Sequence, residues 1–192
     1  MHTYKPLPID REIKISSRNF IVSKTDEKGK ILYVNDVFCD VTGYEEIEVL
    51  GKAHSILRHP DMPAVIFYLM WDKIKSGQNI RALVKNLARS GKYYWVSTDF
   101  EINYESGSKT YIAFRRAVSK KTVRTIEPLY EHLLRIEKAH GLQASLVYLQ
   151  GFLNERHVTF EEYMDSILKP QGIMAILFNK MKGTFSRVAQ AA

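Results

Sequence analysis

Hydrophobic positions along the chain follow two periods, and the change between them predicts the order of the elements. Short runs of alternating, aromatic or β-branched residues predict strands, while apolar residues at three- and four-residue spacing predict helices. Turn residues, glycine above all, separate these runs. The expected strands cover residues 20–23, 31–34, 80–87, 93–103 and 110–118.

The region between the second and third predicted strands is helical. Residues 37–41 and 45–50 have the spacing of short helical turns, and a longer helix begins at Pro63 and ends near Ser76. Proline suits the first turn, because the N–H that it lacks has no intrahelical partner there. The simplest closure is an α+β fold: a five-stranded antiparallel sheet with the helices on one face. A small-molecule pocket can form between such layers.

After residue 118 the pattern changes, and no further strand is expected. The remaining segments are amphipathic, so each needs a partner surface for its apolar stripe. Thr159 and Glu162 have the spacing of a capping box at the start of one segment. The all-α extension of about four helices is expected at residues 123–139, 142–153, 159–168 and 172–188.

These changes of pattern divide the chain into three parts. Residues 1–19 are expected as an extended lead-in, residues 20–118 as one sheet domain, and residues 119–192 as a helical output or docking region. The composition, with 45% hydrophobic and 26% charged residues, is typical of a globular protein. No apolar run approaches the roughly 18 residues needed to span a bilayer, and no signal peptide is evident, so we expect a cytoplasmic protein.

Charge and cysteine content narrow the function classes. The net charge of +7 is spread along the chain without a dense basic cluster, so we expect no nucleic-acid partner. Cys39 is the only cysteine, which excludes an internal disulfide and a CxxC metal site.

The densest group of functional side chains lies in the loop at residues 51–63, where His54, Arg58, His59 and Asp61 stand within eight residues. Loops between rigid elements commonly carry binding groups, and this mixture of imidazole, guanidinium and carboxylate suits a polar ligand. A purely structural interpretation stays open at this stage. In it, Asp61 caps the next helix, Arg58 pairs with a surface acid, and His59 is solvated.

Five short motifs stand out within residues 20–118: NDVFCDVTGY at 35–44, RHPDMP at 58–63, MW at 70–71, VKN at 84–86 and YYWV at 93–96. With these motifs, residues from about 20 to 118 resemble a PAS domain, and are most similar to the PAS domain of Aer-type aerotaxis and energy-taxis receptors. The motif RHPDMP is the specific one, whereas TGY occurs across many PAS domains. The resemblance covers about half of the chain and is not expected to extend to the C-terminal helices.

The resemblance implies a sensor without catalytic turnover. Aer-type PAS domains bind FAD without a covalent link and report its redox state. Arginine and histidine can meet a phosphate or a flavin edge, and asparagine offers both a donor and an acceptor. Carried over onto this sequence, the cofactor-binding residues are Asn35, His54, Arg58, His59, Asp61, Trp71 and Asn86.

Other function classes stay open at this stage. Light-sensing LOV domains, which are also PAS folds, use a cysteine in the helical block to attack flavin. His54 stands at that place here, so no photo-adduct is expected. A haem-binding PAS sensor would use His54 or His59 as an axial ligand. A PAS-regulated transcription regulator would place a helix-turn-helix within residues 157–173. An enzyme is not expected, since we find no nucleophile–base pair, phosphate loop or paired catalytic carboxylates.

The resemblance also implies a partner. Full-length Aer receptors continue into a membrane anchor and a coiled-coil signalling region, and we expect neither in this chain. It looks more like the separate PAS component of two-part energy-taxis systems, which signals to a membrane-bound chemoreceptor-like protein. The C-terminal helices would then be the docking element, and the protein would lie in the cytoplasm, at the inner face of the membrane through its partner. PAS modules often pair, so a homodimer is a further expectation.

Overall fold

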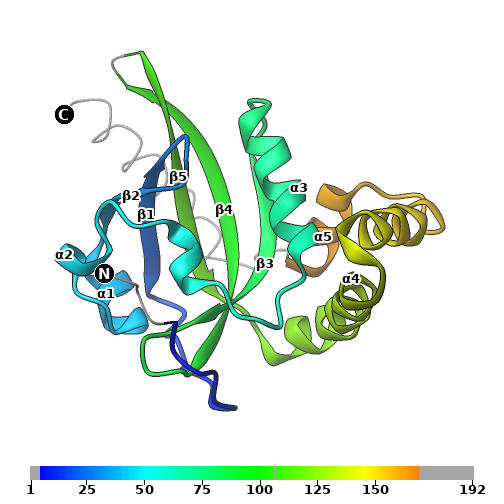
Figure 1. The fold of residues 1–192 in the computed structure, drawn as a ribbon, viewed down its shortest axis with the longest axis horizontal. Coiled ribbons are helices and arrows are strands. Elements are labelled where there is room, and N and C mark those ends of the chain that lie inside the picture. The colour runs from blue at the N-terminus through cyan, green and yellow to red at the C-terminus, as the bar shows by residue number, and fades with distance from the viewer. Residues whose placement is uncertain (1–4, 106, 169–192) are drawn as a thin grey trace.

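A single five-stranded antiparallel sheet forms the centre of the molecule (Figure 1). The structure is a computed structural model, and it describes residues 5–105 and 107–168. The strand order is β2-β1-β5-β4-β3, so the first strand lies between the second and the last strand of the chain. The strands are β1 (Phe20–Asp26), β2 (Ile31–Val34), β3 (Ile80–Leu87), β4 (Tyr93–Glu105) and β5 (Ser108–Ala117).

The helical block crosses one face of this sheet and follows the predicted order. It contains α1 (Asp36–Thr42), α2 (Glu46–Val49), the 3-10 turn η1 (His54–Leu57) and α3 (Ala64–Lys75). Asn35 caps α1, because its side chain accepts the N–H of Phe38. The predicted α+β fold, with a five-stranded sheet and helices over one face, is confirmed.

The C-terminal extension is all-helical within the described residues. It consists of α4 (Lys120–Asn154) and α5 (Phe160–Leu168). Gly141 interrupts α4 with non-helical angles, φ 82° and ψ 174°. The two helical segments on either side of it correspond to the first two predicted helices. The predicted third helix is α5, and its capping box between Thr159 and Glu162 is confirmed. The predicted fourth helix, at residues 172–188, lies outside the described part of the chain.

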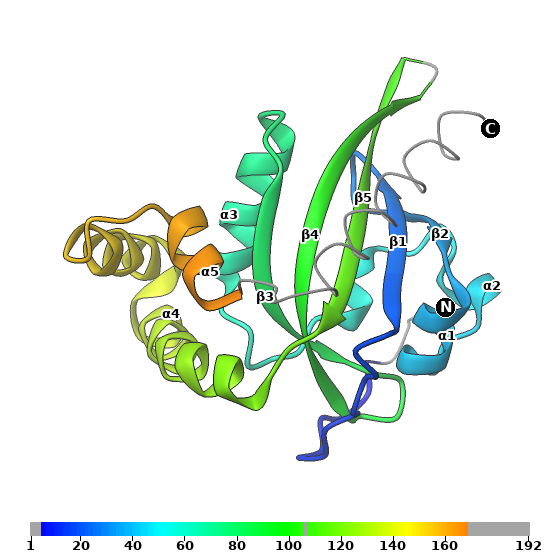
Figure 2. The same cartoon turned by 180° about the vertical axis from the view of Figure 1, so that it is seen from behind.

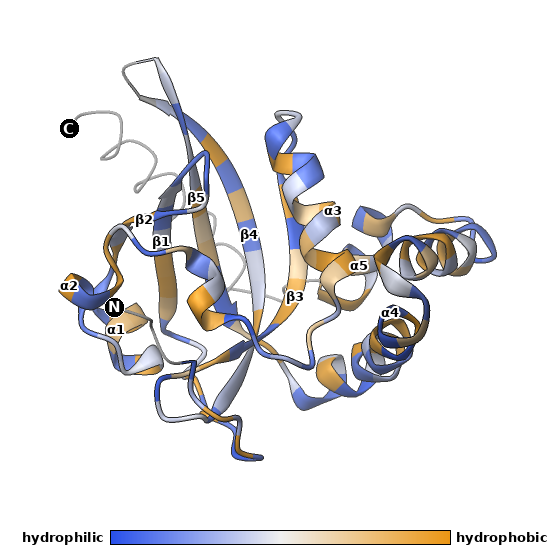
Figure 3. Cartoon of the chain, viewed as in Figure 1, coloured by the Kyte–Doolittle hydropathy of each residue, from blue (hydrophilic) through white to orange (hydrophobic). Residues whose placement is uncertain are grey.

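The extension packs back onto the sheet domain. Figures 1 and 2 show α4 and α5 beside α3 and β3, at the side of the sheet away from β2. The Tyr130 hydroxyl donates to the carbonyl of Leu83 at 2.8 Å, and Arg81 in β3 pairs with Asp165 in α5. Figure 3 shows hydrophobic and hydrophilic residues alternating along α4, as its amphipathic pattern predicts. One continuous core therefore joins the sheet, α3 and both helices of the extension.

The expected N-terminal lead-in runs along the start of β4. The N–H of Ile13 donates to the carbonyl of Tyr93, and the N–H of Tyr93 donates to the carbonyl of Arg11. Within residues 5–105 and 107–168, no helix combines the length and apolar character that a membrane span requires.

Candidate functional site

A cavity of about 450 Å³ lies between the sheet and α3. Its volume falls within the range of about 300–1,000 Å³ that is typical of small-molecule sites. The α3 helix contributes Phe67, Met70, Trp71 and Ile74 to the lining. The sheet contributes the apolar residues Val84, Phe100 and Ala113 and the polar residues Ser23, Thr25, Asn86, Thr98 and Arg115. One wall is therefore apolar and aromatic, and the other combines polar with apolar side chains.

Arg115 is the charged group at the sheet side of this cavity, and only 3% of it is exposed. The pairing of the central strands sets it there, opposite Ile21 of β1 and Thr98 of β4. Its Nη1 donates to Ser23 Oγ at 2.9 Å, and its Nη2 lies 2.9 Å from His54 Nε2. Burial lowers the pKa of Arg115 to about 10, so the guanidinium stays charged at neutral pH.

His54 is neutral and fixed in orientation. Burial, and then the charge of Arg115, hold the pKa of its imidazole well below 6.5. A guanidinium has no acceptor, so His54 Nε2 accepts the hydrogen bond from Arg115 and the ring proton is on Nδ1. Ser23 Oγ lies 3.2 Å from the same nitrogen. One side of the imidazole faces the cavity, which it helps to line.

Asn86 and Thr98 line the same cavity with polar atoms that have no partner. The Asn86 Nδ2 and Thr98 Oγ1 atoms are both buried and make no hydrogen bond of good geometry within the described residues. Asn86 stands opposite Tyr94 in the sheet, and its side chain acts on the pKa of the Tyr94 hydroxyl, which also lacks a well-formed hydrogen bond. A buried donor without a partner costs about 1–3 kcal/mol. Such atoms fit a site whose ligand completes their hydrogen bonds.

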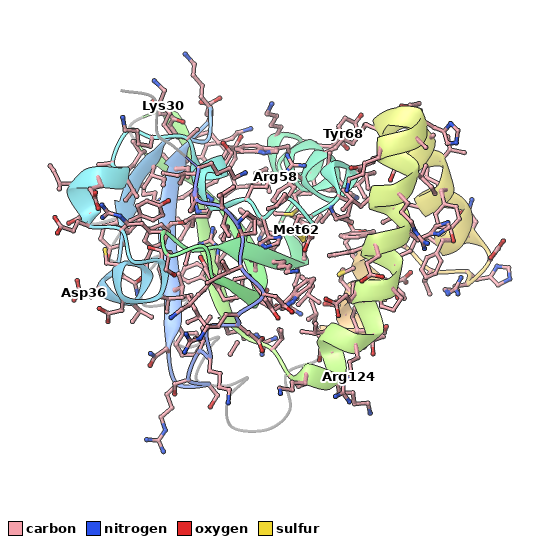
Figure 4. All side chains as sticks on the ribbon, turned by 60° about the horizontal axis from the view of Figure 1, so that its bottom comes forward. Lys30, Asp36, Arg58, Met62, Tyr68 and Arg124 are labelled. Carbon is pink, nitrogen blue, oxygen red and sulfur yellow. The ribbon has the colours of Figure 1, made fainter. Side chains whose placement is uncertain are left out.

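The mouth of the cavity carries two further cations. Lys28 lies on the exposed β1–β2 turn, and Arg58 lies with its guanidinium 4.3 Å from the centre of the Phe67 ring. Figure 4 shows Arg58 and Met62 on the segment between η1 and α3, and Tyr68 on α3 itself. No aspartate or glutamate lines the cavity within the described part of the chain. The cavity is thus cationic.

Trp71 forms the wall between α3 and the β1–β2 turn. A Cβ on Gly29 of that turn would lie 2.9 Å from the Trp71 ring, so the ring packs directly on the glycine backbone. Trp71 also packs edge-on against Tyr111, with ring centres 5.8 Å apart. The turn, α3 and the sheet therefore hold this aromatic side chain in place at the cavity.

The structure brings four of the seven predicted residues to the cavity: His54, Arg58, Trp71 and Asn86. Asn35 lies outside the cavity lining, and its side chain makes hydrogen bonds to the backbone of β1 and α1. Its Oδ1 accepts the N–H groups of Val22 and Phe38, while its Nδ2 donates to the carbonyl of Phe20.

His59 and Asp61 also lie outside the cavity lining. His59 is 3% exposed, and its Nδ1 accepts the N–H of Asp61 at 3.1 Å. The Asp61 carboxylate pairs with Lys85 Nζ at 2.7 Å, across the edge of β3. The two residues hold the RHPDMP loop on the outer side of the sheet edge.

The structural interpretation of this loop also needs correction. Asp61 does not cap α3, because it pairs with Lys85; the N-terminus of α3 is capped by Glu137 of α4. His59 is buried and not solvated. Arg58 stacks on Phe67, and the nearby Glu137 carboxylate partly offsets the lowering of its pKa by burial.

Sequence reasoning missed Arg115, Ser23 and Thr98. Arg115 stood in a predicted strand with an alternating pattern, which is a signal that it faces one side of the sheet. Arg115 contacts Ser23, which is 92 positions away in the sequence, and His54, which is 61 positions away. The pairing of β1 with β5 brings Ser23 to Arg115, and η1 places His54 there.

The remaining candidates lie away from the cavity. Cys39 is on α1 and does not line the cavity; burial raises the pKa of its thiol. For haem ligation, His54 Nε2 is already bonded to Arg115, and His59 is outside the cavity. For DNA binding, the part of residues 157–173 that the structure describes contains α5. The first turn of α5 is acidic, with Glu161 and Glu162, and its apolar side is buried.

Comparison with known proteins agrees with this geometry. Residues 31–114 match a family model described as the PAS fold. This part of the chain has the PAS fold. The structure is similar to a solved light-oxygen-voltage domain from a study of a flavin analogue, with a TM-score of 0.50 and 20% sequence identity. The superposition includes 59% of this chain and 87% of that domain's chain. That likeness supports the fold.

Two curated proteins, an aerotaxis receptor and a transcriptional activator, are similar to this chain in sequence. Over 151 residues, or 78% of this chain, it is 29% identical to the aerotaxis receptor of Escherichia coli (strain K12). Over 103 residues, or 53% of this chain, it is 31% identical to the bacterioopsin transcriptional activator of Halobacterium salinarum. The matches span only 30% and 15% of those two proteins. A match of 151 residues cannot end at residue 118, so the similarity reaches into the helical extension, contrary to expectation.

Proposed function

We propose that this protein is a PAS sensor that binds FAD non-covalently in the cavity and signals its redox state. The observation that carries the proposal is the pairing of an aromatic wall with buried polar atoms, on Asn86 and Thr98, that have no partner. A flat ring with polar edges would pack on the first and complete the second. Flavin supplies reversible electron transfer when bound.

Different residues of the cavity would contact the ring face, the ring edge and the phosphates of FAD. Phe67 and Trp71 offer aromatic surface to a planar ring. Asn86 and Thr98 offer hydrogen bonds to its edge. The phosphates of the dinucleotide would lie beside Lys28 and Arg58, which supply positive charge. Because Arg58 and Lys28 lie on different segments, a bound diphosphate would also fix the β1–β2 turn relative to α3.

We also propose that the protein is an Aer-type energy sensor. The similarity to an aerotaxis receptor, together with the RHPDMP motif, supports an Aer-type energy sensor. We place the protein in the cytoplasm, as the PAS component that signals to a membrane-bound chemoreceptor-like partner. No enzymatic turnover is needed for that role. Pairing of two PAS domains remains part of this proposal.

The extension offers a path for the signal. Leu142, directly after the break at Gly141, lines the cavity together with Ala64 at the start of α3. Glu137, one turn earlier in α4, holds the first turn of α3 through two hydrogen bonds. A change at the ligand that moves α3 would therefore act on α4 directly. The surface of the extension would then be the docking element.

The experiment is an absorbance spectrum of freshly purified protein, and of the same protein after incubation with FAD and gel filtration. We expect the band of oxidised flavin at about 450 nm, which dithionite removes and air restores. A Soret band would replace the flavin proposal with haem. Absence of any flavin band after incubation with FAD would contradict the proposal.

A further inference from the structure

Arg115 carries a buried positive charge that only neutral groups compensate. Its three hydrogen-bond partners are Ser23 Oγ, His54 Nε2 and the carbonyl of Ala113. No carboxylate pairs with it among the residues that the structure describes. An isolated buried charge is unfavourable unless paired or well hydrogen-bonded.

Arg81, in the same sheet, shows the contrast. Its guanidinium lies 2.6 Å from Asp99 and 2.8 Å from Asp165, so two carboxylates balance its charge. Acidic partners thus balance the charge of Arg81. At Arg115 the adjacent space is the cavity, and residues 5–105 and 107–168 supply no partner of opposite sign.

Arg58, which also lines the cavity, differs from Arg115 in its exposure to solvent and in having a carboxylate nearby. It lies at the mouth, stacked on Phe67, and the charge of Glu137 acts on it. Arg115 is thus the group whose charge a ligand deep in the cavity would meet with the least competition from solvent or from acidic side chains. Low effective dielectric strengthens that interaction.

We propose that Arg115 recognises negative charge on the bound ring, favours the reduced form of the flavin over the oxidised form, and so sets the potential at which the sensor switches. This inference rests on the proposed function. Two electrons from a reductant such as dithionite, with one proton from solvent, leave a flavin ring with one negative charge more than the oxidised ring. The guanidinium compensates that added charge. His54 and Ser23 act as positioning residues, because their hydrogen bonds fix the guanidinium.

The test is a spectroelectrochemical titration of bound FAD in the wild-type chain and in three variants. Arg115→Gln removes the charge but keeps a donor within reach of His54; Arg115→Lys keeps the charge. Arg58→Gln is the matched control, because it removes a cation at the mouth. We expect Arg115→Gln to weaken binding of reduced relative to oxidised flavin at least tenfold, which lowers the midpoint by about 30 mV for a two-electron couple. We expect Arg115→Lys to lower it less, and Arg58→Gln to weaken binding of both forms alike and leave the midpoint unchanged.

The outcomes separate this inference from the proposed function. If the wild type binds FAD and Arg115→Gln binds it with the same midpoint, the inference is wrong and the flavin proposal stands. If Arg115→Gln does not fold, the wild type decides: bound FAD must have a higher midpoint than free FAD, and a lower one overturns the inference. If the wild type binds no FAD, the proposed function fails and this inference fails with it.

Discussion

The Glu137 carboxylate of α4 accepts the backbone N–H of Ala64 at 2.7 Å, and its second oxygen accepts the N–H of Val65 at the same distance. An N-terminus of a helix has unpaired N–H groups and a partial positive charge, so a carboxylate there is favourable. The cap that α3 lacks in its own sequence comes from a residue more than 70 positions later. The helical extension is therefore tied to the helix that forms a wall of the cavity.

The first prediction concerns this tie. Glu137→Gln replaces one acceptor oxygen with an NH₂ group that opposes a backbone N–H, so we expect the free energy of unfolding to fall by about 1 kcal/mol. Hydrogen exchange in the first turn of α3 should increase as well. Glu131→Gln, at an exposed position on the same helix, is the control and should change neither. Equal stability of the two variants would mean that the cap contributes nothing.

The second prediction concerns Gly29 and Trp71. Gly29 and Gly77 both have left-handed backbones, with φ of 76° and 86°. Alanine at either position should cost about 1–2 kcal/mol of stability through backbone strain. A Cβ at Gly77 meets nothing within 4 Å, whereas one at Gly29 lies 2.9 Å from the Trp71 ring. Only Gly29→Ala should therefore change tryptophan fluorescence and weaken FAD binding. Identical fluorescence and affinity in the two variants would contradict the assigned place of Trp71.

The third prediction concerns pH. Burial and the nearby Lys85 lower the pKa of His59 to about 4, although Asp61 opposes this, so the folded protein holds the imidazole neutral. The unfolded chain binds the proton near pH 6.5, its ordinary pKa. The stability that neutral His59 contributes is thus present above pH 6.5 and is lost as the pH falls from 6.5 towards 4.

Denaturation at a series of pH values measures this effect. His59→Asn places an amide oxygen near the site of Nδ1, keeps an acceptor for the N–H of Asp61, and cannot take up a proton. We expect a smaller loss of stability between pH 6.5 and 4 than in the wild type. The exposed His140→Asn should retain the wild-type slope. An unchanged slope in His59→Asn would show that other groups carry the pH dependence.

The fourth prediction separates binding from stability at Asn86. Leucine has a similar size and removes the buried Nδ2 that has no partner, so the ligand-free variant should be as stable as the wild type or up to about 1 kcal/mol more stable. Its affinity for FAD should fall at least tenfold, because a polar contact to the ligand is lost. Asn79→Leu, at an exposed position before β3, is the control and should keep the wild-type affinity. A destabilised Asn86→Leu that still binds FAD would contradict this role.

The sequence predicted the elements well because their signals are local. β2 and β3 have the predicted bounds, and the break at Gly141 falls where the helical pattern stopped. The cap of α1 by Asn35 is also a local feature, because asparagine is favoured at the N-cap position. The assignment of Asn35 to the cofactor came from the resemblance, and the structure shows its polar atoms engaged in the fold.

The polar side of the cavity depends on distant contacts, and a single sequence does not contain them. Arg115 reaches His54 and Ser23 only because β5 lies between β1 and β4. Glu137 stands on an amphipathic helix with no mark that distinguishes it from the other surface acids. The loop residues His59 and Asp61 formed the clearest motif, yet they bind each other and Lys85 instead of lining the cavity.

A crystal structure of the FAD-reconstituted protein tests the central claim most directly. We predict electron density for the flavin ring between α3 and the sheet, packed against Trp71 or Phe67 and within hydrogen-bond distance of Asn86 or Arg115. A protein that carries FAD elsewhere on its surface, with this cavity filled by water or by collapsed side chains, would contradict the account.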